Sequence, residues 1–471
     1  MKKVLDFTNF LENSIFKNAF EFFLKKEIDF YIVGGAIRDF LLGKKEIKDL
    51  DILLSFNPAE IINELSRKVE GFPFLLDKER KEWRIVIKNN FTLDIGEIEK
   101  DIETDLSNRD FTINSITIKY PEKVLIDKFG GIGDIRKKIV RAFKKENLIK
   151  DPLRMLRAFR FMATFKFEIE GDTLNFISEN KEKILESARE RIMRELYIIF
   201  SEGEKIYETI LKMKESGLLF VLVPELKNME GSLQVYKDKS LDVLFHTLNC
   251  VYYLERFYKN YKRTFFKKYE KDLKEIFEPE NRFLLFLSII FHDIGKPLTR
   301  TFEDNRTRFI GHDKVGANIA YRWAKDFRFS EKFAKKLKSM VYFHMYPHLL
   351  GKEEEITKRA IFRYLKKTGD LWLFLFVHAY ADFRATPPGK NPGYLKNLLK
   401  KVYDFKLESE KERPLPLING YDLINLGLTP GPIFRKILNE VEELRAEGVL
   451  KTKEEALIYV RKNYLEEKEI T

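Results

Sequence analysis

The sequence predicts an α+β protein in which a small mixed β-sheet is followed by an all-helical remainder. Three observations lead to this prediction. The first third of the chain alternates strand-like and helix-like segments. From about Asp134 to the end, apolar residues recur at helical spacing. All six histidines lie between His246 and His378, so the helical part is expected to hold a second chemistry of its own.

The composition is that of a strongly charged globular protein. At roughly 150 residues per domain, 471 residues suggest about three domains. The single cysteine, Cys250, excludes an intramolecular disulfide and fits a reducing cytosol. The N-terminus lacks the apolar core of a signal peptide, and the most apolar stretch, 283–291, is too short to span a bilayer. We therefore expect a cytoplasmic protein that does not bind membranes.

The net charge points to the kind of partner. The chain carries 86 basic and 74 acidic residues, a formal charge of +12. A positive balance favours an anionic partner such as a nucleic acid or nucleotide, because lysine and arginine neutralise phosphates. A solvated charged surface would have the same composition, so the charge alone does not separate the two interpretations.

A strand, a glycine turn and a helix are expected at the start of the sheet. Residues 28–35 (IDFYIVGG) are typical of a strand that ends in a turn at Gly34 and Gly35, and residues 36–43 of a helix. Further strands are predicted over 50–56, 83–89 and 91–98. Because glycine has no Cβ, the backbone N–H groups of this turn could approach a phosphate closely.

Three carboxylates on the predicted strands indicate a cation site. Asp49 and Asp51 are two residues apart on a strand and so share a face of the sheet. Like charges so placed repel each other and usually need a cation between them, and hard oxygen ligands suit Mg²⁺ with a nucleoside triphosphate. Asp94, on another predicted strand, could lie beside this pair. Three carboxylates that hold two Mg²⁺ ions suit in-line phosphoryl or nucleotidyl transfer.

Five ordered motifs resemble a known family. Asn108–Asn114 is similar to a motif usually written RRDFTIN, with Asn108 in place of the first arginine. On these motifs the chain resembles the class II tRNA nucleotidyltransferase and bacterial poly(A) polymerase family over about 200 residues. The segments concerned are 33–39 with 49–51, 108–114, 125–135, 151–161 and 190–196.

The resemblance implies a role for each residue that matches a motif. Asp49 and Asp51 would ligate Mg²⁺, and Asp94 would assist as the third catalytic carboxylate. Asp151 and Arg154 would read the Watson–Crick edge of CTP or ATP, since both bases present an amine beside a ring acceptor. The full set of nucleotide-binding residues that the resemblance implies is Gly34, Gly35, Arg38, Arg109, Asp110, Asn114, Asp151, Arg154, Arg157 and Arg160.

Two departures from the family pattern bear on the product. Lys150 stands where many relatives carry glutamate, which puts any role of that carboxylate in doubt. The link from Asp94 to Asp105 is only 11 residues long, whereas relatives that build the whole CCA end commonly have a longer flexible segment there. The resemblance therefore favours addition of CC to the tRNA 3′ end over complete CCA. A poly(A) polymerase or A-adding enzyme is the alternative.

The histidine-rich half resembles an HD domain. His246, the pair His292–Asp293 and Asp382 follow the order expected of HD metal ligands, which come from separate helices. His312 and His344 resemble the extra ligands of HD proteins that bind two metals. Imidazoles with carboxylates suit a transition metal or Mg²⁺, and a metal-bound water could attack a phosphoester.

The remaining histidines, His348 and His378, are interpreted as structural. The expected domains are the nucleotidyltransferase head (1–135), a helical neck and RNA-binding body (136–235), the HD metal-binding domain (236–395) and a helical tail (396–471). The expected partners are tRNA, CTP and ATP, and the oligomeric state is left open. An alternative of another class is an HD phosphohydrolase of RNA ends with a head that only binds.

Overall fold

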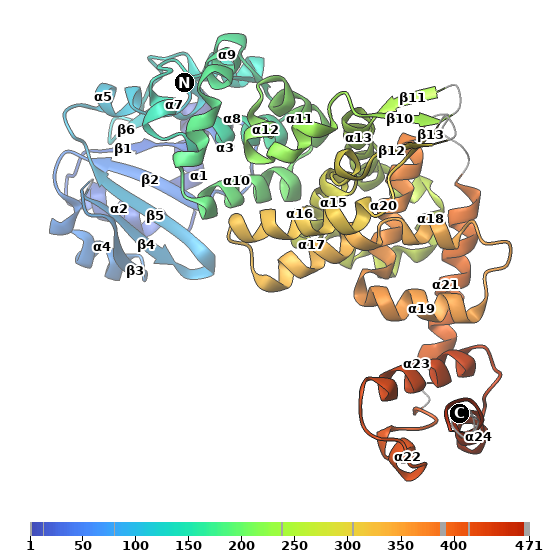
Figure 1. The fold of residues 1–471 in the computed structure, drawn as a ribbon. Helices are drawn as coiled ribbons and strands as arrows, with labels where there is room; N and C mark the ends of the chain where they lie inside the picture. The colour runs from blue at the N-terminus through green and yellow to red at the C-terminus, as the bar shows by residue number, and fades with distance from the viewer. Residues whose placement is uncertain are drawn as a thin grey trace. The chain divides into compact units, whose positions relative to one another are not determined.

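The computed structural model describes residues 2–12, 14–79, 81–236, 239–303, 306–386, 392–412 and 415–465. The chain divides into two compact units, residues 1–222 and 223–471 (Figure 1). The first contains a mixed sheet with helices, and the second is mostly helical. The predicted α+β class is confirmed. No helix of the described residues is long and apolar enough to cross a membrane.

The first unit is built on one seven-stranded sheet in the order β3-β4-β5-β2-β1-β6-β7. Neighbouring strands are antiparallel except β2 and β5, which pair in parallel near the centre. Its strands are β1 (Phe30–Val33), β2 (Asp49–Leu54), β3 (Phe72–Asp77), β4 (Glu82–Ile87), β5 (Phe91–Glu97), β6 (Thr117–Tyr120) and β7 (Val124–Ile126), and the separate pair β8 (Ile139–Val140) and β9 (Glu168–Ile169). Its helices are α1 (Lys2–Glu12), α2 (Lys17–Lys25), α3 (Gly35–Leu41), α4 (Ile62–Lys68), α5 (Ile102–Ser107), α6 (Gly131–Lys137), α7 (Asn147–Lys150), α8 (Leu153–Phe165), α9 (Gly171–Asn180), α10 (Arg189–Glu202), α11 (Ile206–Glu215) and α12 (Leu218–Leu222).

Alternation along β1 gives the sheet two apolar faces. Phe30 stacks on Tyr120 of β6, with ring centroids 4.7 Å apart, and also contacts Phe20 and Phe23 of α2. Val33, three residues further along β1, belongs to a separate cluster on the other face with Leu53 of β2 and Leu106 of α5. Because both faces are covered, the central strands are held in register, and that register positions the side chains of the site.

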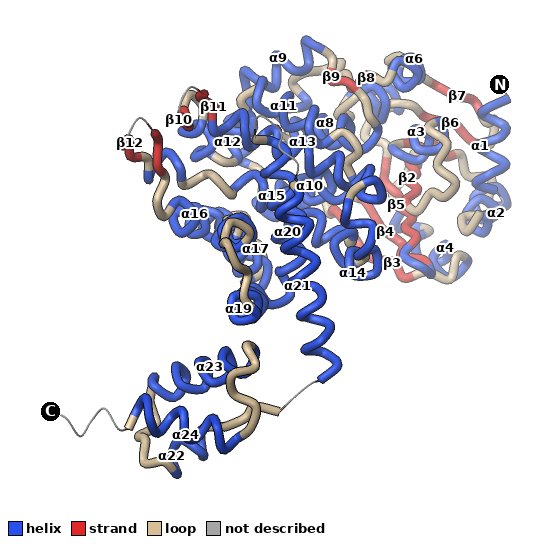
Figure 2. Tube along the Cα trace, turned by 90° about the vertical axis from the view of Figure 1, so that its right-hand side faces the viewer, coloured by secondary structure: helices blue, strands red, loops and turns tan. Residues whose placement is uncertain are grey.

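The second unit is a helical assembly that continues into a tail (Figure 2). Helices α13, α15, α16, α17 and α20 pack against one another, and the tail has its own core around Leu423, Ile437 and Val441. The helices are α13 (Val243–Asn260), α14 (Glu270–Leu273), α15 (Pro279–Phe291), α16 (His312–Asp326), α17 (Glu331–Phe343), α18 (Tyr346–Leu350), α19 (Lys358–Thr368), α20 (Trp372–Ala385), α21 (Gly393–Glu412), α22 (Gly420–Asn425), α23 (Pro432–Ala446) and α24 (Lys453–Tyr464). The strands are β10 (Leu233–Tyr236), β11 (Lys239–Asp242), β12 (Thr301–Glu303) and β13 (Arg306–Arg308).

The prediction of unbroken helical structure after Asp134 is wrong in detail. Three two-stranded ladders interrupt it, β8–β9, β10–β11 and β12–β13. Each of their strands has only two to four residues. Strands this short carry no alternating pattern that stands out from the helical periodicity around them.

Candidate active sites

The glycine turn after β1 exists because a side chain there would collide with a carboxylate. Gly34 has φ +80° and ψ −147°, a conformation almost restricted to glycine. A Cβ built on Gly34 would overlap the Oδ2 atom of Asp51 and lie 3.3 Å from a guanidinium nitrogen of Arg109. A Cβ on Gly35 would lie 2.9 Å from a guanidinium nitrogen of Arg38. The two glycines thus admit three charged side chains to the space beside the turn.

The parallel pairing of β2 with β5 brings two of the predicted carboxylates together. Asp51 lies directly opposite Asp94 in the register, and Asp49 lies opposite Thr92. Burial is the main cause that raises the pKa of Asp51 to about 6; the nearby carboxylates of Asp94 and Asp49 also raise it, and the charge of Arg109 opposes them. Asp51 therefore lies where negative charge accumulates, and a cation would relieve it.

Asp49 is placed differently from the other two carboxylates. It is exposed at the start of β2, and its Oδ1 accepts a hydrogen bond of 2.6 Å from the Thr92 hydroxyl. It does not line the cleft that contains Asp51 and Asp94. Alternation puts Asp49 on the same face as Asp51, as expected, but Asp49 lies at the exposed start of the strand.

Arg84 is a neighbour of this site that the sequence analysis missed. It lies opposite Asp94 in the antiparallel pairing of β4 with β5, and its Nε and a terminal nitrogen donate to the two carboxylate oxygens at 2.7 and 2.6 Å. The buried Asp94 thus already has a bidentate cation partner.

The chemistry of these residues fits Mg²⁺. Mg²⁺ is usually held by one or two carboxylates together with substrate phosphates and water, so a closed protein cage is not needed. Asp51 is the carboxylate best placed to bind it, with Asp49 beside it on the open side and Asp94 on the neighbouring strand. When bound, the cation would offset the burial of the Asp51 carboxylate and its repulsion by Asp94 and Asp49.

A cleft of about 680 Å³ in the first unit gathers all ten predicted nucleotide-binding residues. Its walls come from the Gly34 turn, β2, β5, the 105–114 segment and the start of α8. All the residues predicted for nucleotidyl transfer except Asp49 line it, together with further residues such as Glu82 and Glu97. The predicted residues in its lining are Gly34, Gly35, Arg38, Asp51, Asp94, Arg109, Asp110, Asn114, Asp151, Arg154, Arg157 and Arg160.

A buried hydrogen-bond network joins the motifs around Asp110. The side-chain Nδ2 of Asn114 donates to Asp110 at 2.8 Å, and a guanidinium nitrogen of Arg38 donates to the side-chain Oδ1 of Asn114 at 2.5 Å. Arg157 from α8 lies 3.0 Å from the other oxygen of Asp110. Although burial opposes ionisation, Arg157 and Asn114 hold the pKa of Asp110 below its usual range. The network therefore fixes Asp110 as an anion between two arginine-bearing helices.

The residues expected to read the base also have partners within the protein. Asp151 pairs with Arg191 of α10 at 2.9 Å, and Arg154 donates to the backbone oxygens of Asn108 and Asn147 at 2.9 and 3.2 Å. Both side chains line the cleft. Arg191 belongs to the last predicted motif, so this pair links the base-reading segment to the neck.

Arg160 and Glu195 form a second link between α8 and α10. The Nε of Arg160 lies 2.8 Å from a Glu195 oxygen. The guanidinium also lies over the Phe161 ring, 4.6 Å from its centroid. Burial lowers the pKa of Arg160 and raises that of Glu195, against their mutual attraction.

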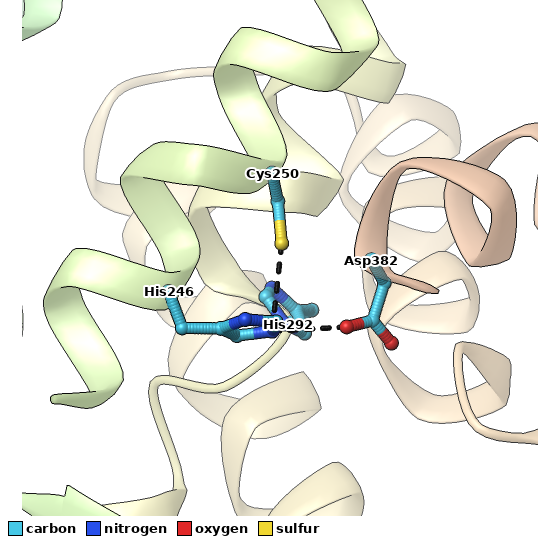
Figure 3. Close-up of side chains that lie close together, drawn as sticks. All are labelled: His246, Cys250, His292 and Asp382. Carbon is cyan, nitrogen blue, oxygen red and sulfur yellow. Dashed lines mark hydrogen bonds and ion pairs between the residues drawn. The ribbon is translucent and has the colours of Figure 1, made fainter. Parts of the chain in front are cut away.

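In the second unit, the first group of candidate metal ligands joins three helices (Figure 3). His246 and Cys250 lie on α13, His292 directly follows α15, and Asp382 lies on α20. One ligand atom from each of the four lies within 4.8 Å of every other. The His246 Nε2 is 2.9 Å from an Asp382 oxygen. The predicted trio of His246, His292 and Asp382 is therefore brought together, and Cys250 joins it.

A second group lies beside the first, and its aspartate, Asp293, directly follows His292 of the first group. Asp293, His312 and His344 also have ligand atoms within 4.8 Å of one another. The Oδ1 of Asp293 is 3.7 Å from His312 Nε2, whereas its Oδ2 is 3.1 Å from His292 Nε2. One oxygen of Asp293 thus faces each group, the arrangement of a carboxylate that bridges two cations. The Lys296 ammonium lies 2.6 Å from the Oδ2 atom.

The histidine tautomers suit metal ligation. The Nδ1 atoms of His292, His312 and His344 lie 2.6–2.7 Å from the backbone oxygens of Ile289, Phe309 and Val341, so each Nδ1–H donates there. The Nε2 of each ring is then the nitrogen left for a ligand, and backbone carbonyls commonly orient metal-binding histidines in this way. Burial lowers the pKa values of His312 and His344, which keeps both rings neutral. The donor set fits a divalent transition metal.

The two histidines interpreted as structural both lie at this site. The Nε2 of His348 is 2.9 Å from Asp382 and its Nδ1 is 2.6 Å from the Tyr394 hydroxyl. His378 is fully buried, with its ring centroid 5.4 Å from that of His292, and burial lowers its pKa to about 3. His348 therefore orients Asp382. His378 is neutral and packs beside the ring of His292.

Three family models match consecutive parts of the chain. The Poly A polymerase head domain matches residues 30–99 and 81–141, the model described as probable RNA and SrmB- binding site of polymerase A matches 166–230, and the HD domain matches 243–365. A CC-adding tRNA nucleotidyltransferase of Thermus thermophilus is 31% identical over 451 residues, which cover 94% of each chain. The chain belongs to the tRNA nucleotidyltransferase family.

Other relatives within this family differ in the nucleotide that they add. An A-adding tRNA nucleotidyltransferase of Deinococcus radiodurans is 28% identical over 439 residues, 92% of this chain and 94% of that protein. Among solved structures, the Thermotoga maritima CCA-adding enzyme complexed with tRNA has a TM-score of 0.62 at 22% identity, covering 93% of this chain and 92% of that chain. This tRNA nucleotidyltransferase therefore has the fold of the CCA-adding enzymes.

Proposed function

We propose that this tRNA nucleotidyltransferase adds two C residues from CTP to the 3′ end of tRNA, in the cytoplasm. The observation that carries the proposal is the shortness of the connection after the Asp94 strand. β5 ends at Glu97 and α5 begins at Ile102, so only residues 98–101 join them. In this family, the enzymes that reshape the pocket for the terminal A commonly need a longer segment there. The identity to a CC-adding relative supports the same product.

The reaction that the cleft would support is an in-line transfer. The 3′ hydroxyl of the tRNA attacks the α-phosphorus of CTP, a new P–O bond forms, the bond to the β-phosphate breaks and pyrophosphate leaves. Asp51, with Asp49 and Asp94, would hold Mg²⁺, which would polarise the hydroxyl and neutralise the leaving group. The Gly34 turn and Arg109 would position the triphosphate, and Asn114 the ribose.

Base selection would come from the side chains at the start of α8. A carboxylate accepts from the exocyclic amine of cytosine, and a guanidinium donates to its ring acceptors. Asp151 and Arg154 line the cleft and have these two properties. Their partners Arg191 and the 108 and 147 carbonyls would hold them in place, so that the protein serves as the template.

The binding partner follows from the same proposal. The helical residues 136–235 would bind the tRNA backbone through lysine and arginine, which read shape more than sequence. The proposed boundaries place the head at 1–135, the HD domain at 236–395 and the tail at 396–471. A relative of the same fold has been solved with tRNA, which supports tRNA as the substrate.

The test uses three tRNA substrates, which lack CCA, end in C or end in CC, with CTP and ATP supplied separately and together. Products are sized at single-nucleotide resolution. Arrest at CC, with no A added to the CC-ended tRNA, supports the proposal. Addition of A alone would place this protein with the A-adding relative, and a complete CCA end would show that the four-residue connection permits a second pocket shape. Asp51→Asn is the inactive control.

A second function, hydrolysis of a phosphate at RNA ends, is favoured by the two ligand groups that Asp293 joins. A 3′-phosphate or 2′,3′-cyclic phosphate blocks the hydroxyl that must attack CTP, so its removal would serve the transferase. RNA ending in a cyclic phosphate is the substrate, with each divalent metal tested in turn. Asp293→Asn should abolish hydrolysis and spare C addition, and Asp51→Asn should do the reverse. If the wild-type protein hydrolyses this RNA with none of the metals, the proposal is wrong.

A further inference from the structure

Cys250 lies where neither the sequence pattern nor the HD resemblance requires a ligand. It is one helical turn after His246 on α13, so the two side chains share a face of the helix. Its Sγ is 3.5 Å from the His246 Nε2, and Figure 3 shows it pointing into the space between His246, His292 and Asp382. The side chain is fully buried, and Cys250 is the only cysteine of the chain.

The sulfur lies at the separation that a shared tetrahedral ion would produce. With a metal–sulfur distance of about 2.3 Å and a metal–nitrogen distance of about 2.1 Å, a tetrahedral angle puts sulfur and nitrogen about 3.6 Å apart. The separation between Sγ and Nε2 is 3.5 Å.

A second observation points to a ligand in the same space. The Nε2 of His292, a residue 1% exposed, makes no hydrogen bond within the described residues, and what it faces at 3.1 Å is an acceptor, the Asp293 carboxylate. Because the Nδ1 of His292 is 2.7 Å from the Ile289 oxygen, the Nδ1–H donates there and the Nε2 is the ring atom left for a ligand. A buried nitrogen that makes no hydrogen bond and lies within 4.8 Å of the Cys250 sulfur is a second donor for a cation in this space.

We propose that Cys250 is a metal ligand, which makes this position a His₂AspCys site for a soft or borderline cation such as Zn²⁺, Fe²⁺ or Co²⁺. The neighbouring position, formed by Asp293, His312 and His344, offers nitrogen and oxygen donors alone. The two positions therefore differ in the metal that they prefer, and neither matches the all-oxygen Mg²⁺ site proposed in the head. The inference rests on the proposed metal binding of this half, and it is independent of hydrolytic turnover.

Binding at this position is a proton exchange without a redox change. The thiol S–H bond breaks, its proton leaves to solvent, and the thiolate forms the bond to the metal. Burial raises the pKa of the Cys250 thiol well above its usual range, so without a cation the thiol is protonated. Metal uptake should therefore release a proton from Cys250.

Cobalt substitution provides a test that does not depend on activity. Metal-free full-length protein, kept in a thiol-free reductant, is titrated with Co²⁺ and its absorption recorded. A thiolate bound to Co²⁺ gives a charge-transfer band in the near ultraviolet, and in this chain only Cys250 can supply a thiolate. We expect that band in the wild type and its loss in Cys250→Ser and Cys250→Ala. Val251→Ala, which truncates the buried neighbour on the same helix, should retain it.

The outcomes distinguish metal binding at this site from ligation by the Cys250 sulfur. Visible d–d bands without the charge-transfer band would show that Co²⁺ binds without sulfur, which overturns the role of Cys250 and leaves the metal site standing. Absence of both would overturn the metal site itself. The wild-type spectrum decides the matter even if a variant fails to fold. Loss of a residue that only hydrogen-bonds to a metal ligand already weakens metal binding about 10- to 100-fold, so loss of this ligand itself should weaken Zn²⁺ binding by at least that factor.

Discussion

Gly34→Ala should inactivate the transferase through the carboxylate that its turn accommodates. Two effects add. The φ of +80° and ψ of −147° cost a non-glycine residue about 1–3 kcal/mol. At tenfold per 1.36 kcal/mol, this strain alone would lower kcat/KM about 5- to 150-fold if the turn relaxes away from its geometry. The new Cβ also overlaps the Asp51 carboxylate, which must then leave its place opposite Asp94. We therefore expect a loss of at least about 100-fold.

The same helix provides a matched control. Gly34 lies just before α3 and Gly43 just after it. Gly43 also has a positive φ, +84°, but a Cβ built there meets no atom within 4 Å. Gly43→Ala should thus lower the stability by about 1 kcal/mol and leave kcat/KM for CTP incorporation unchanged. Both variants are assayed by C addition to a CCA-less tRNA and by thermal unfolding. Equal activity in the two variants would refute the argument that the Gly34 turn makes room for Asp51.

Three further predictions concern other parts of the chain. Arg157→Ala removes the cation beside the buried Asp110 and should cost about 3 kcal/mol in denaturant unfolding at neutral pH. Because the pKa of Asp110 is lowered in the folded state, this stabilisation is present above the unfolded pKa and is lost as pH falls through the folded pKa. The difference in free energy of unfolding between wild type and variant should therefore disappear in acid. Stripping metals with a chelator should abolish both proposed activities. Mg²⁺ should then restore C addition, and a transition metal should restore hydrolysis; rescue of hydrolysis by Mg²⁺ alone would contradict the donor sets. Glu443→Gln weakens the link from α23 to Arg359 and Arg363 of α19, so hydrogen exchange in α23 should accelerate at unchanged kcat for C addition; unaltered exchange would show that the tail is held by other contacts.

The central features of the head could be predicted because they are local in sequence. The strand, glycine turn and helix around Gly34 follow from residue types alone, and alternation correctly puts Asp49 and Asp51 on one face. Arg84 could not be predicted as the partner of Asp94, because that contact depends on the register between β4 and β5. Register is set by packing across the whole sheet and carries no local signal.

In the histidine-rich half, too, the contacts between separate elements could not be predicted from the local sequence. The HD resemblance predicted that His246, His292 and Asp382 share a site, and one group of ligands contains all three. His378 and Asp382 lie on α20, a helix that is apolar almost all round, so periodicity does not indicate which face meets the other helices. Cys250 resembles any small buried residue until its distance to His246 is known.

The parallel pairing of β2 with β5 also has a kinetic consequence. Asp51 and Asp94 are 43 positions apart in the chain, with the β3–β4 hairpin between them, yet they lie on adjacent strands. Such a non-local contact forms only after the entropy of closing the intervening loop has been overcome, which delays it relative to helix formation. During refolding, the ability to incorporate CTP should therefore return later than the helical circular dichroism, and its time course would report the closure of the sheet centre.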